Sequence, residues 1–155
     1  WYRKAADHGD AKALGLLGEM LRTGEGTPVD KREAARLYRE SAEKGDAASQ
    51  YVLARMYERG DGVPRDTYES ARLLRRSAEQ GHAAAQNALG RAYEIGLGVP
   101  RDVRNAAIWH ARAAANGFSA SERRLEALRL RHPELPSAKE LESAEPDPIP
   151  KDARD

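Results

Sequence analysis

The chain has 155 residues, and its 26 lysines and arginines nearly balance 25 aspartates and glutamates, which gives a formal net charge of +1. This balance excludes the strongly basic surface by which a protein binds nucleic acid or an anionic membrane through bulk charge. The sequence has no cysteine, which excludes disulfides, thiolate nucleophiles and cysteine-ligated metal sites. Helix formers dominate and aromatic residues make up only 6%, so the composition favours packed helices over sheets.

The chain begins at Trp1 without an initiator methionine or a charged-then-apolar leader. We therefore expect it to be a processed chain or an excised piece of a longer protein. No apolar stretch approaches the roughly 20 residues that a membrane-spanning helix requires, so we expect no membrane insertion.

A repeat of 36 residues governs the sequence. Residues 37–72 and 73–108 are identical at 20 of 36 positions without a gap, and the same shift aligns residues 1–10 with 37–46 and extends to 109–118. A fixed period between roughly 20 and 50 residues is typical of arrays in which each unit packs on the next.

Each repeat is expected to form two helices, and residues 46–59 represent the first. Apolar residues such as Leu53 and Tyr57 fall on one face of a helix with 3.6 residues per turn. Gly60 follows the last turn, where glycine adopts the left-handed conformation that ends many helices. Pro64 disfavours helix in the residue before it, so the chain has to turn there before the second helix.

The second helix of each repeat is expected to begin after an aspartate that caps its first turn. The capping aspartates are Asp30, Asp66 and Asp102. Glu33 and Glu69 are expected to complete a reciprocal capping box, and Asn105 departs from that pattern in the third copy. The buried stripe of this helix is represented by Ala34, Leu37, Tyr38, Ser41 and Ala42. The small residues that let the paired helices approach closely are Gly18, Ala54 and Gly90.

These residues resemble the Sel1-like repeat, a relative of the tetratricopeptide repeat. The family pattern Ala-x-Ala-Gln-x-x-Leu-Gly-x-x-Tyr-x-x-Gly-x-Gly-Val-x-x-Asp-x-x-x-Ala is matched best by residues 83–106. The resemblance covers residues 1–131. It implies an all-α fold, a right-handed α-solenoid of antiparallel helix pairs built from 36-residue repeats.

We expect two regions along the chain. Residues 1–131 form the Sel1-like repeat solenoid, about three and a half repeats, and end in a capping helix over 118–131 whose polar outer face includes Ser121. Residues 132–155 hold five of the eight prolines and have four more acidic than basic residues. We interpret them as a Pro-rich acidic tail or linker that is flexible, apart from a candidate short helix at 137–144.

The sequence contains no catalytic or metal-binding pattern. The recurring Gly-x-Gly turns lack the preceding strand and the lysine or third glycine of a phosphate-binding loop. His8, His82, His110 and His132 include no pair at the i, i+4 spacing of helical metal ligands, and we interpret them as surface residues. We therefore expect a protein that is not an enzyme and has no catalytic residue, metal site or cofactor.

A solenoid of helix pairs presents a concave groove that is lined mostly by its first helices. If the central leucine of each first helix lies in the packing layer, the side chains two positions before and after it face the groove. This rule, together with positions further along the groove and one on the capping helix, gives the predicted partner-binding residues. They are Glu19, Tyr51, Arg55, Glu58, Asn87, Arg91, Glu94 and Arg123. Tyr51, Arg55 and Arg91 are the strongest candidates, because tyrosine and arginine are over-represented at interface hot spots.

The leading hypothesis is a non-enzymatic protein–protein interaction scaffold or adaptor that holds a peptide or protein partner in the concave groove. An acidic or carboxylate-bearing segment would meet Arg55 and Arg91. The resemblance implies a role in bacterial signalling, envelope or effector processes, and it leaves periplasm and cytoplasm open. The alternatives are an immunity protein that neutralises a secreted effector, and binding or hydrolysis of an envelope ligand such as peptidoglycan. Self-association through exposed solenoid ends is a further hypothesis.

Overall fold

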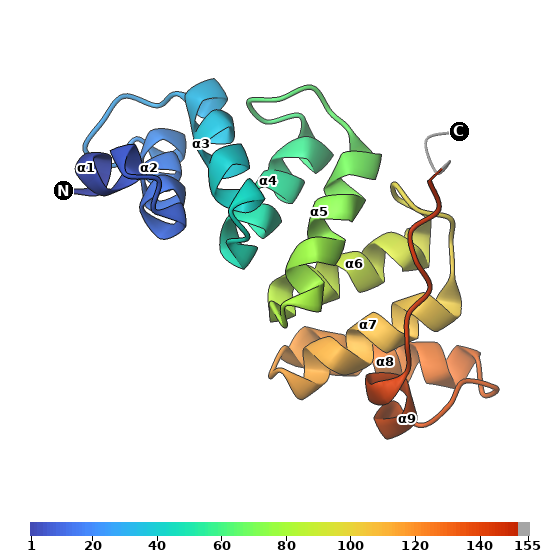
Figure 1. Ribbon diagram of the computed structural model, residues 1–155. Helices are drawn as coiled ribbons and strands as arrows, with labels where there is room; N and C mark the ends of the chain where they lie inside the picture. The colour runs from blue at the N-terminus through green and yellow to red at the C-terminus, as the bar shows by residue number, and fades with distance from the viewer. Residues whose placement is uncertain (152–155) are drawn as a thin grey trace. The chain divides into compact units, whose positions relative to one another are not determined.

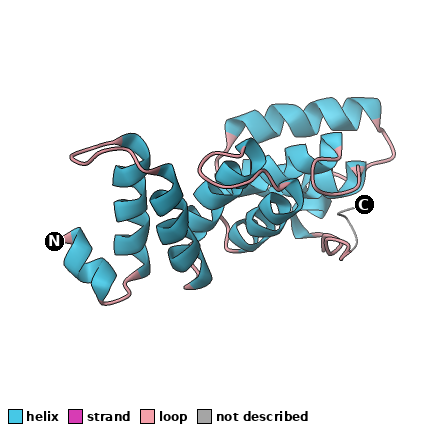
Figure 2. Cartoon of the chain, turned by 90° about the horizontal axis from the view of Figure 1, so that it is seen from above, coloured by secondary structure: helices cyan, strands magenta, loops and turns pink. Residues whose placement is uncertain are grey.

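The computed structural model describes residues 1–151, which form nine α-helices and no strand (Figure 1). The helices are α1 (Tyr2–Asp7), α2 (Ala11–Thr23), α3 (Lys31–Glu43), α4 (Ala47–Arg59), α5 (Thr67–Glu79), α6 (Ala83–Ile95), α7 (Val103–Ala115), α8 (Ser119–Arg131) and α9 (Ala138–Ser143). Figure 2 shows these helices joined by loops and turns. The predicted all-helical fold of consecutive helix pairs is confirmed.

The chain divides into two compact units, Trp1–Leu73 and Leu74–Asp155, and the boundary falls inside α5. In the first unit, α3 packs against both α2 and α4, and α1 packs against α2. In the second unit, α7 packs against α6, α8 and α9. Within its own unit, α3 lies between α2 and α4, and α7 lies between α6 and α8.

The predicted buried stripe of the second helix is confirmed in α3. All five of its residues are buried: Ala34, Leu37, Tyr38, Ser41 and Ala42. In α7 the burial goes further, because every residue from Asn105 to Ala111 is buried. A helix that is buried all round has no solvent face, so α7 is enclosed to a greater degree than α3.

Each capping aspartate makes two bonds at the start of its helix. Its side chain accepts a hydrogen bond from the backbone N–H three residues on, as predicted. Its own backbone N–H donates to a carbonyl of the preceding first helix, nine residues earlier. The pairs are Asp30 with Leu21 (2.8 Å), Asp66 with Tyr57 (3.0 Å) and Asp102 with Tyr93 (2.9 Å). The loop inside each repeat is therefore closed at the same point in every copy.

The predicted capping boxes at Glu33 and Glu69 are wrong. A capping box requires the glutamate to accept a bond from the backbone N–H of the capping residue, and that N–H already donates to the first helix. The two glutamates instead pair with an arginine three residues on. Glu33 lies 2.7 Å from Arg36, and Glu69 lies 3.0 Å from Arg72.

Glycines on the first helices allow the close approach that the sequence indicated. A Cβ atom built on Gly18 would lie 3.3 Å from the ring of Tyr38, and one built on Gly90 would lie 2.8 Å from the ring of His110. The second distance is too short for a real side chain, so the position of the His110 ring depends on the missing side chain of Gly90.

His110 is fully buried, so the prediction that the histidines lie on the surface is wrong for this one. Its Nε2 lies 2.7 Å from Glu94 Oε1, and its Nδ1 lies 3.4 Å from Ser121 Oγ. Ser121 is buried as well, contrary to its predicted place on the outer face of the cap, and its hydroxyl donates to Asn87 Oδ1 at 2.9 Å. Arg124 pairs with Glu94 at 3.3 Å. This network joins α6, α7 and α8.

Within the second unit, the described chain after residue 131 packs against α7 through α9. Residues 138–143 form α9, where the sequence indicated a short helix, and Leu141 is fully buried. Figure 1 shows the red segment after α9 passing across α7, and Pro146 on it is buried. The described part of this segment is therefore held in place, although its prolines and acidic residues indicated a linker or flexible tail.

Replacement of Gly90 by alanine is expected to destabilise the protein, because the new methyl group has no room beside the His110 ring. Overpacking costs about 1–3 kcal/mol, and the better helix propensity of alanine offsets about 1 kcal/mol of this. A net loss of roughly 1 kcal/mol in the free energy of unfolding is expected in urea titrations. Arg91→Ala, at an exposed neighbour, is the matched control and should change that free energy little. A Gly90→Ala chain as stable as the wild type would contradict the close packing.

Burial holds the pKa of His110 below its usual value of 6.5, although the hydrogen bond to Glu94 opposes this shift. The positive charges of Arg124 and Arg91 also lower the pKa. In the folded chain His110 therefore stays neutral at pH values where the unfolded chain already binds a proton. The unfolded state then binds more protons, so the free energy of unfolding falls as the pH decreases.

We expect the melting temperature to fall as the pH is lowered through the ordinary histidine range, from about 7.5 to about 5.5. His110→Gln removes the titrating group while keeping a donor for Glu94, and should make this fall smaller. His8→Gln, at an exposed site, is the control and should leave the fall unchanged. Identical pH profiles for the three chains would show that His110 does not titrate between the two states.

Candidate functional site

The first unit has two adjoining hollows on the face formed by α2 and α4. The first hollow, called the apolar hollow here, has a volume of about 420 Å³. Its lining residues are Lys12, Gly15, Leu16, Glu19, Tyr38, Asp46, Ala48, Ser49 and Val52. Leu16 is 48% exposed, and its side chain offers a contact for an apolar group of a partner.

The second hollow, called the arginine hollow here, has a volume of about 230 Å³. Its lining residues are Arg22, Tyr51, Val52, Arg55, Met56, Arg59 and Asp61. Val52 lines both hollows, so an apolar surface leads directly to a group of three arginines. The predicted residues Tyr51 and Arg55 both lie in this hollow, and Glu19 lies in the apolar one.

The carboxylate of Glu19 is bonded to side chains of the protein itself. It accepts two hydrogen bonds from Arg22, at 2.9 and 2.6 Å, and one from the hydroxyl of Tyr38. The bonds from Arg22 hold the pKa of Glu19 below its usual value and raise the pKa of Arg22, while burial raises the pKa of Tyr38. Glu19 is therefore ionised and orients Arg22 toward the arginine hollow.

The arginines of the second hollow differ in their partners. Arg55 pairs with Glu58 at 2.6 Å, so two of the predicted residues contact each other. No carboxylate of the described residues pairs with Arg59, which is exposed in the last turn of α4. Arg59 was not among the predicted residues, because the rule of two positions on either side of the leucine does not reach it. Its positive charge is available to an acidic partner.

The other predicted residues lie in the second unit, which is described by itself. Arg91 and Arg123 are exposed, on α6 and α8. Asn87 accepts the hydroxyl of Ser121, and Glu94 bonds to His110 and Arg124. Asn87 and Glu94 therefore hold neighbouring helices together, and their polar groups are occupied by these contacts.

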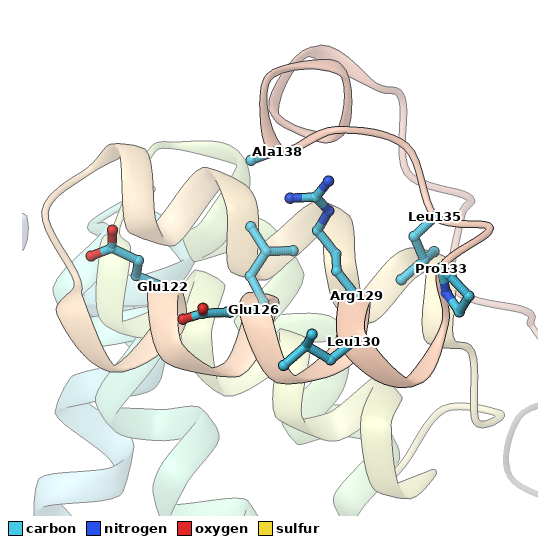
Figure 3. A pocket seen from close by; sticks show the side chains of 8 residues that line it. Glu122, Glu126, Arg129, Leu130, Pro133, Leu135 and Ala138 are labelled. Atoms are coloured by element: carbon cyan, nitrogen blue, oxygen red, sulfur yellow. The ribbon is translucent and has the colours of Figure 1, made fainter.

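The second unit has its own hollow of about 650 Å³ beside α8 (Figure 3). It lies between α8 and the chain that leads to α9, and Figure 3 shows Arg129 and Leu130 on the α8 side with Pro133 and Leu135 on the other. Glu122 and Glu126 stand at its edge along α8. The lining of this hollow mixes acidic, basic and apolar side chains, and its charged groups do not point toward one common position.

Glu94, His110 and Ser121 contact one another in the order acid, histidine, serine, which is the order of a catalytic triad. A substrate has no access to them. His110 and Ser121 are fully buried, and the Ser121 hydroxyl donates to Asn87. A nucleophile has to reach the atom that it attacks, so this arrangement serves packing. Residues 1–151 also contain no group of three or more His, Asp or Glu side chains placed to hold a metal ion. None of their helices has the length and apolar character needed to cross a membrane.

Comparison with known proteins identifies the family of the chain. A solved structure of a protective antigen present in uropathogenic Escherichia coli strains, which displays an SLR fold, is 38% identical over 85% of this chain with a TM-score of 0.83. A Sel1 repeat protein from Oxalobacter formigenes is 26% identical over 83% of this chain with a TM-score of 0.80. The chain spans 28% and 53% of the lengths of these two proteins. No curated protein sequence matches it.

The Sel1 repeat family matches four consecutive segments, residues 1–10, 11–46, 47–82 and 83–118. The boundaries of the full segments are 36 residues apart, which is the period found in the sequence. The matched segments cover most of the chain, which therefore belongs to the Sel1 repeat family.

Proposed function

We propose that the chain is a non-enzymatic adaptor that holds an acidic peptide segment of a protein partner on the α2–α4 face of the first unit. Sel1 repeats are commonly protein–protein interaction scaffolds, and the family is generally non-catalytic. The observation that carries the proposal is the junction at Val52, where the apolar hollow meets the arginine hollow.

The two hollows suit two chemically different parts of one peptide. An apolar side chain in the apolar hollow would be removed from water against Leu16 and Val52, which contributes affinity. A carboxylate in the arginine hollow would meet Arg55 and Arg59, and an arginine can bind a carboxylate through two parallel hydrogen bonds. Because the hollows adjoin, the preferred ligand has an apolar residue and an acidic residue close together in sequence.

The exposed Arg91 and Arg123 are proposed as further contacts for a longer acidic partner. Their charge has the same sign as that of the arginine hollow, so they would attract the same kind of segment. We propose that the biological setting is bacterial signalling, an envelope process or an effector, which is the setting that the family resemblance implies.

Selection of a displayed random-peptide library on the full chain tests this function. Peptides that pair a large apolar residue with a nearby Asp or Glu are expected to be enriched. Affinity for a selected peptide should fall at least about tenfold in the double variant Arg55→Ala/Arg59→Ala, because two charge-assisted contacts are removed. The melting temperature should change little, since both side chains are at the surface.

Arg32→Ala is the matched control, since Arg32 is an exposed arginine on the second helix α3. It removes the same charge from a different face and should leave the affinity unchanged. Equal losses from the Arg32 and Arg55/Arg59 variants would show that the peptide responds to net charge alone, and unchanged binding by the double variant would refute the site.

A further inference from the structure

The third copy of the repeat departs from the other two on the outer side of its second helix. In α3 and α5 this surface has a glutamate and an arginine three residues apart, and the arginine side chains are more than half exposed: 57% for Arg36 and 54% for Arg72. In α7 the equivalent positions are Asn105 and Ile108, which are 2% and 0% exposed. A solvated ion pair has been replaced by a buried amide and a buried apolar side chain.

The chain's own C-terminal segment covers this surface through its backbone. Arg112 donates to the carbonyl oxygens of Glu142 (3.3 Å) and Ala144 (2.7 Å), and Arg75 donates to the carbonyl oxygen of Asp147 (2.7 Å). The backbone N–H of Asp147 donates to Asn105 Oδ1 at 2.9 Å. Side chains of the repeats thus bind the main chain of this segment as they would bind a peptide.

Side chains of α7 also contact the carboxylate of Asp147. Asn105 Nδ2 donates to Asp147 Oδ2 at 3.3 Å, and Arg104 lies 3.9 Å from the same oxygen. One asparagine therefore contacts both the backbone and the carboxylate of the aspartate. The glutamate found at the equivalent position in the other copies has no donor and would repel Asp147.

Trp109 holds the two main arginines of this surface in place. The guanidinium groups of Arg75 and Arg112 lie 5.2 and 5.0 Å from the centre of its ring, within the range of cation–π contacts. The equivalent position is leucine in the two preceding full copies, at Leu37 and Leu73, and tryptophan in the partial first copy, at Trp1. Arginine is also present one repeat earlier at both equivalent positions, Arg39 and Arg76, so the tryptophan and not the arginine pair distinguishes this copy from the one before it.

We propose that the surface formed by Arg75, Arg104, Asn105, Trp109 and Arg112, here called the tail site, is a binding site for peptides that carry a leucine in a short helix and, five residues later and beyond the end of that helix, a Pro-Asp pair. Residues 141–147 occupy it as a tethered ligand, with Leu141 and Pro146 buried and Asp147 recognised by Asn105. This inference goes beyond the proposed adaptor function, because it concerns second helices of the second unit and uses none of the same residues.

A tethered ligand competes with any free peptide at an effective concentration in the millimolar range. A peptide added in solution therefore binds the wild-type chain weakly, even when its intrinsic affinity for the tail site is high. Substitutions in the tail weaken the tethered competitor without altering the site. A protein partner with the same leucine and Pro-Asp pattern would have to displace the tail in the same way.

The test uses the full chain with Leu141→Ser and Asp147→Ala, and a fluorescent peptide with the sequence of residues 138–150. Fluorescence anisotropy should show saturable binding at least about tenfold tighter than to the wild-type chain. An Asp147→Asn version of the peptide should bind at least about tenfold more weakly. Absence of saturable binding by the folded variant, or equal binding of both peptides, would overturn the proposal.

A repeat-consensus variant tests the site itself. Asn105→Glu with Ile108→Arg, added to the tail variant, recreates the outer surface of α5 and should abolish peptide binding while the helices remain intact by circular dichroism. Glu33→Asn, at the equivalent position of the first unit, is the control and should leave peptide binding unchanged. Arg55→Ala/Arg59→Ala should also bind the tail peptide normally, so failure of the proposed function and failure of this inference can be told apart.

A second measurement covers the case in which the tail variant does not fold. In the otherwise wild-type chain, Asn105→Glu should release the tail and increase the rate of tryptic cleavage at Lys139 at least about tenfold. Glu33→Asn should leave that rate unchanged. An unchanged rate in the Asn105→Glu chain would show that Asn105 does not hold the tail, and would overturn the inference.

Discussion

The helices of this protein are short and amphipathic, and a helix of 13 residues is marginal by itself in water. Each one is stable only where a neighbouring helix covers its apolar stripe. In the first unit α3 is covered by α2 on one side and α4 on the other. The close approach depends on small residues at the contact, because Gly18 leaves room for the Tyr38 ring where a larger side chain would not. The surfaces discussed above are what this packing leaves exposed.

The packing separates two kinds of surface. First helices contribute the α2–α4 face, where side chains differ from copy to copy while the backbone repeats. Second helices use most of their surface for contacts with neighbouring helices. Their outer side is exposed and carries ion pairs such as Glu33–Arg36. In α7 that outer side has changed its chemistry and is covered by the chain itself. On the two proposals made above, the same helix-pair packing supports two unrelated recognition surfaces.

The features that the sequence predicted well are local ones that recur. Helix bounds, capping aspartates and glycine stops depend on residues within one turn of each other, and three copies make each signal visible. The position of Tyr51 and Arg55 beside a hollow follows from the same periodicity. The capping boxes failed because the competing carbonyl lies nine residues away, across a loop whose closure no local pattern describes.

The features that the sequence missed depend on distant partners. The repeat aligns His110 with Tyr38, which was predicted to be buried, but a histidine there was interpreted as a surface residue because its partner Glu94 lies on another helix. The tail has the composition of a flexible segment, but Asn105 and Asp147, 42 residues apart, bond to each other. The departure of Asn105 from the repeat was visible in the sequence. Its meaning required the position of the aspartate that it contacts.

The backbone bond that closes the loop inside each repeat constrains how such a chain can change in length. Because Leu21, Tyr57 and Tyr93 receive the N–H of an aspartate at a constant separation, one added residue in this loop would break that bond and shift the following helix out of register with its neighbours. Addition of 36 residues at once would preserve every such bond and extend the stack by one pair. Growth and shortening of this architecture should therefore proceed in whole repeats, while single insertions accumulate elsewhere.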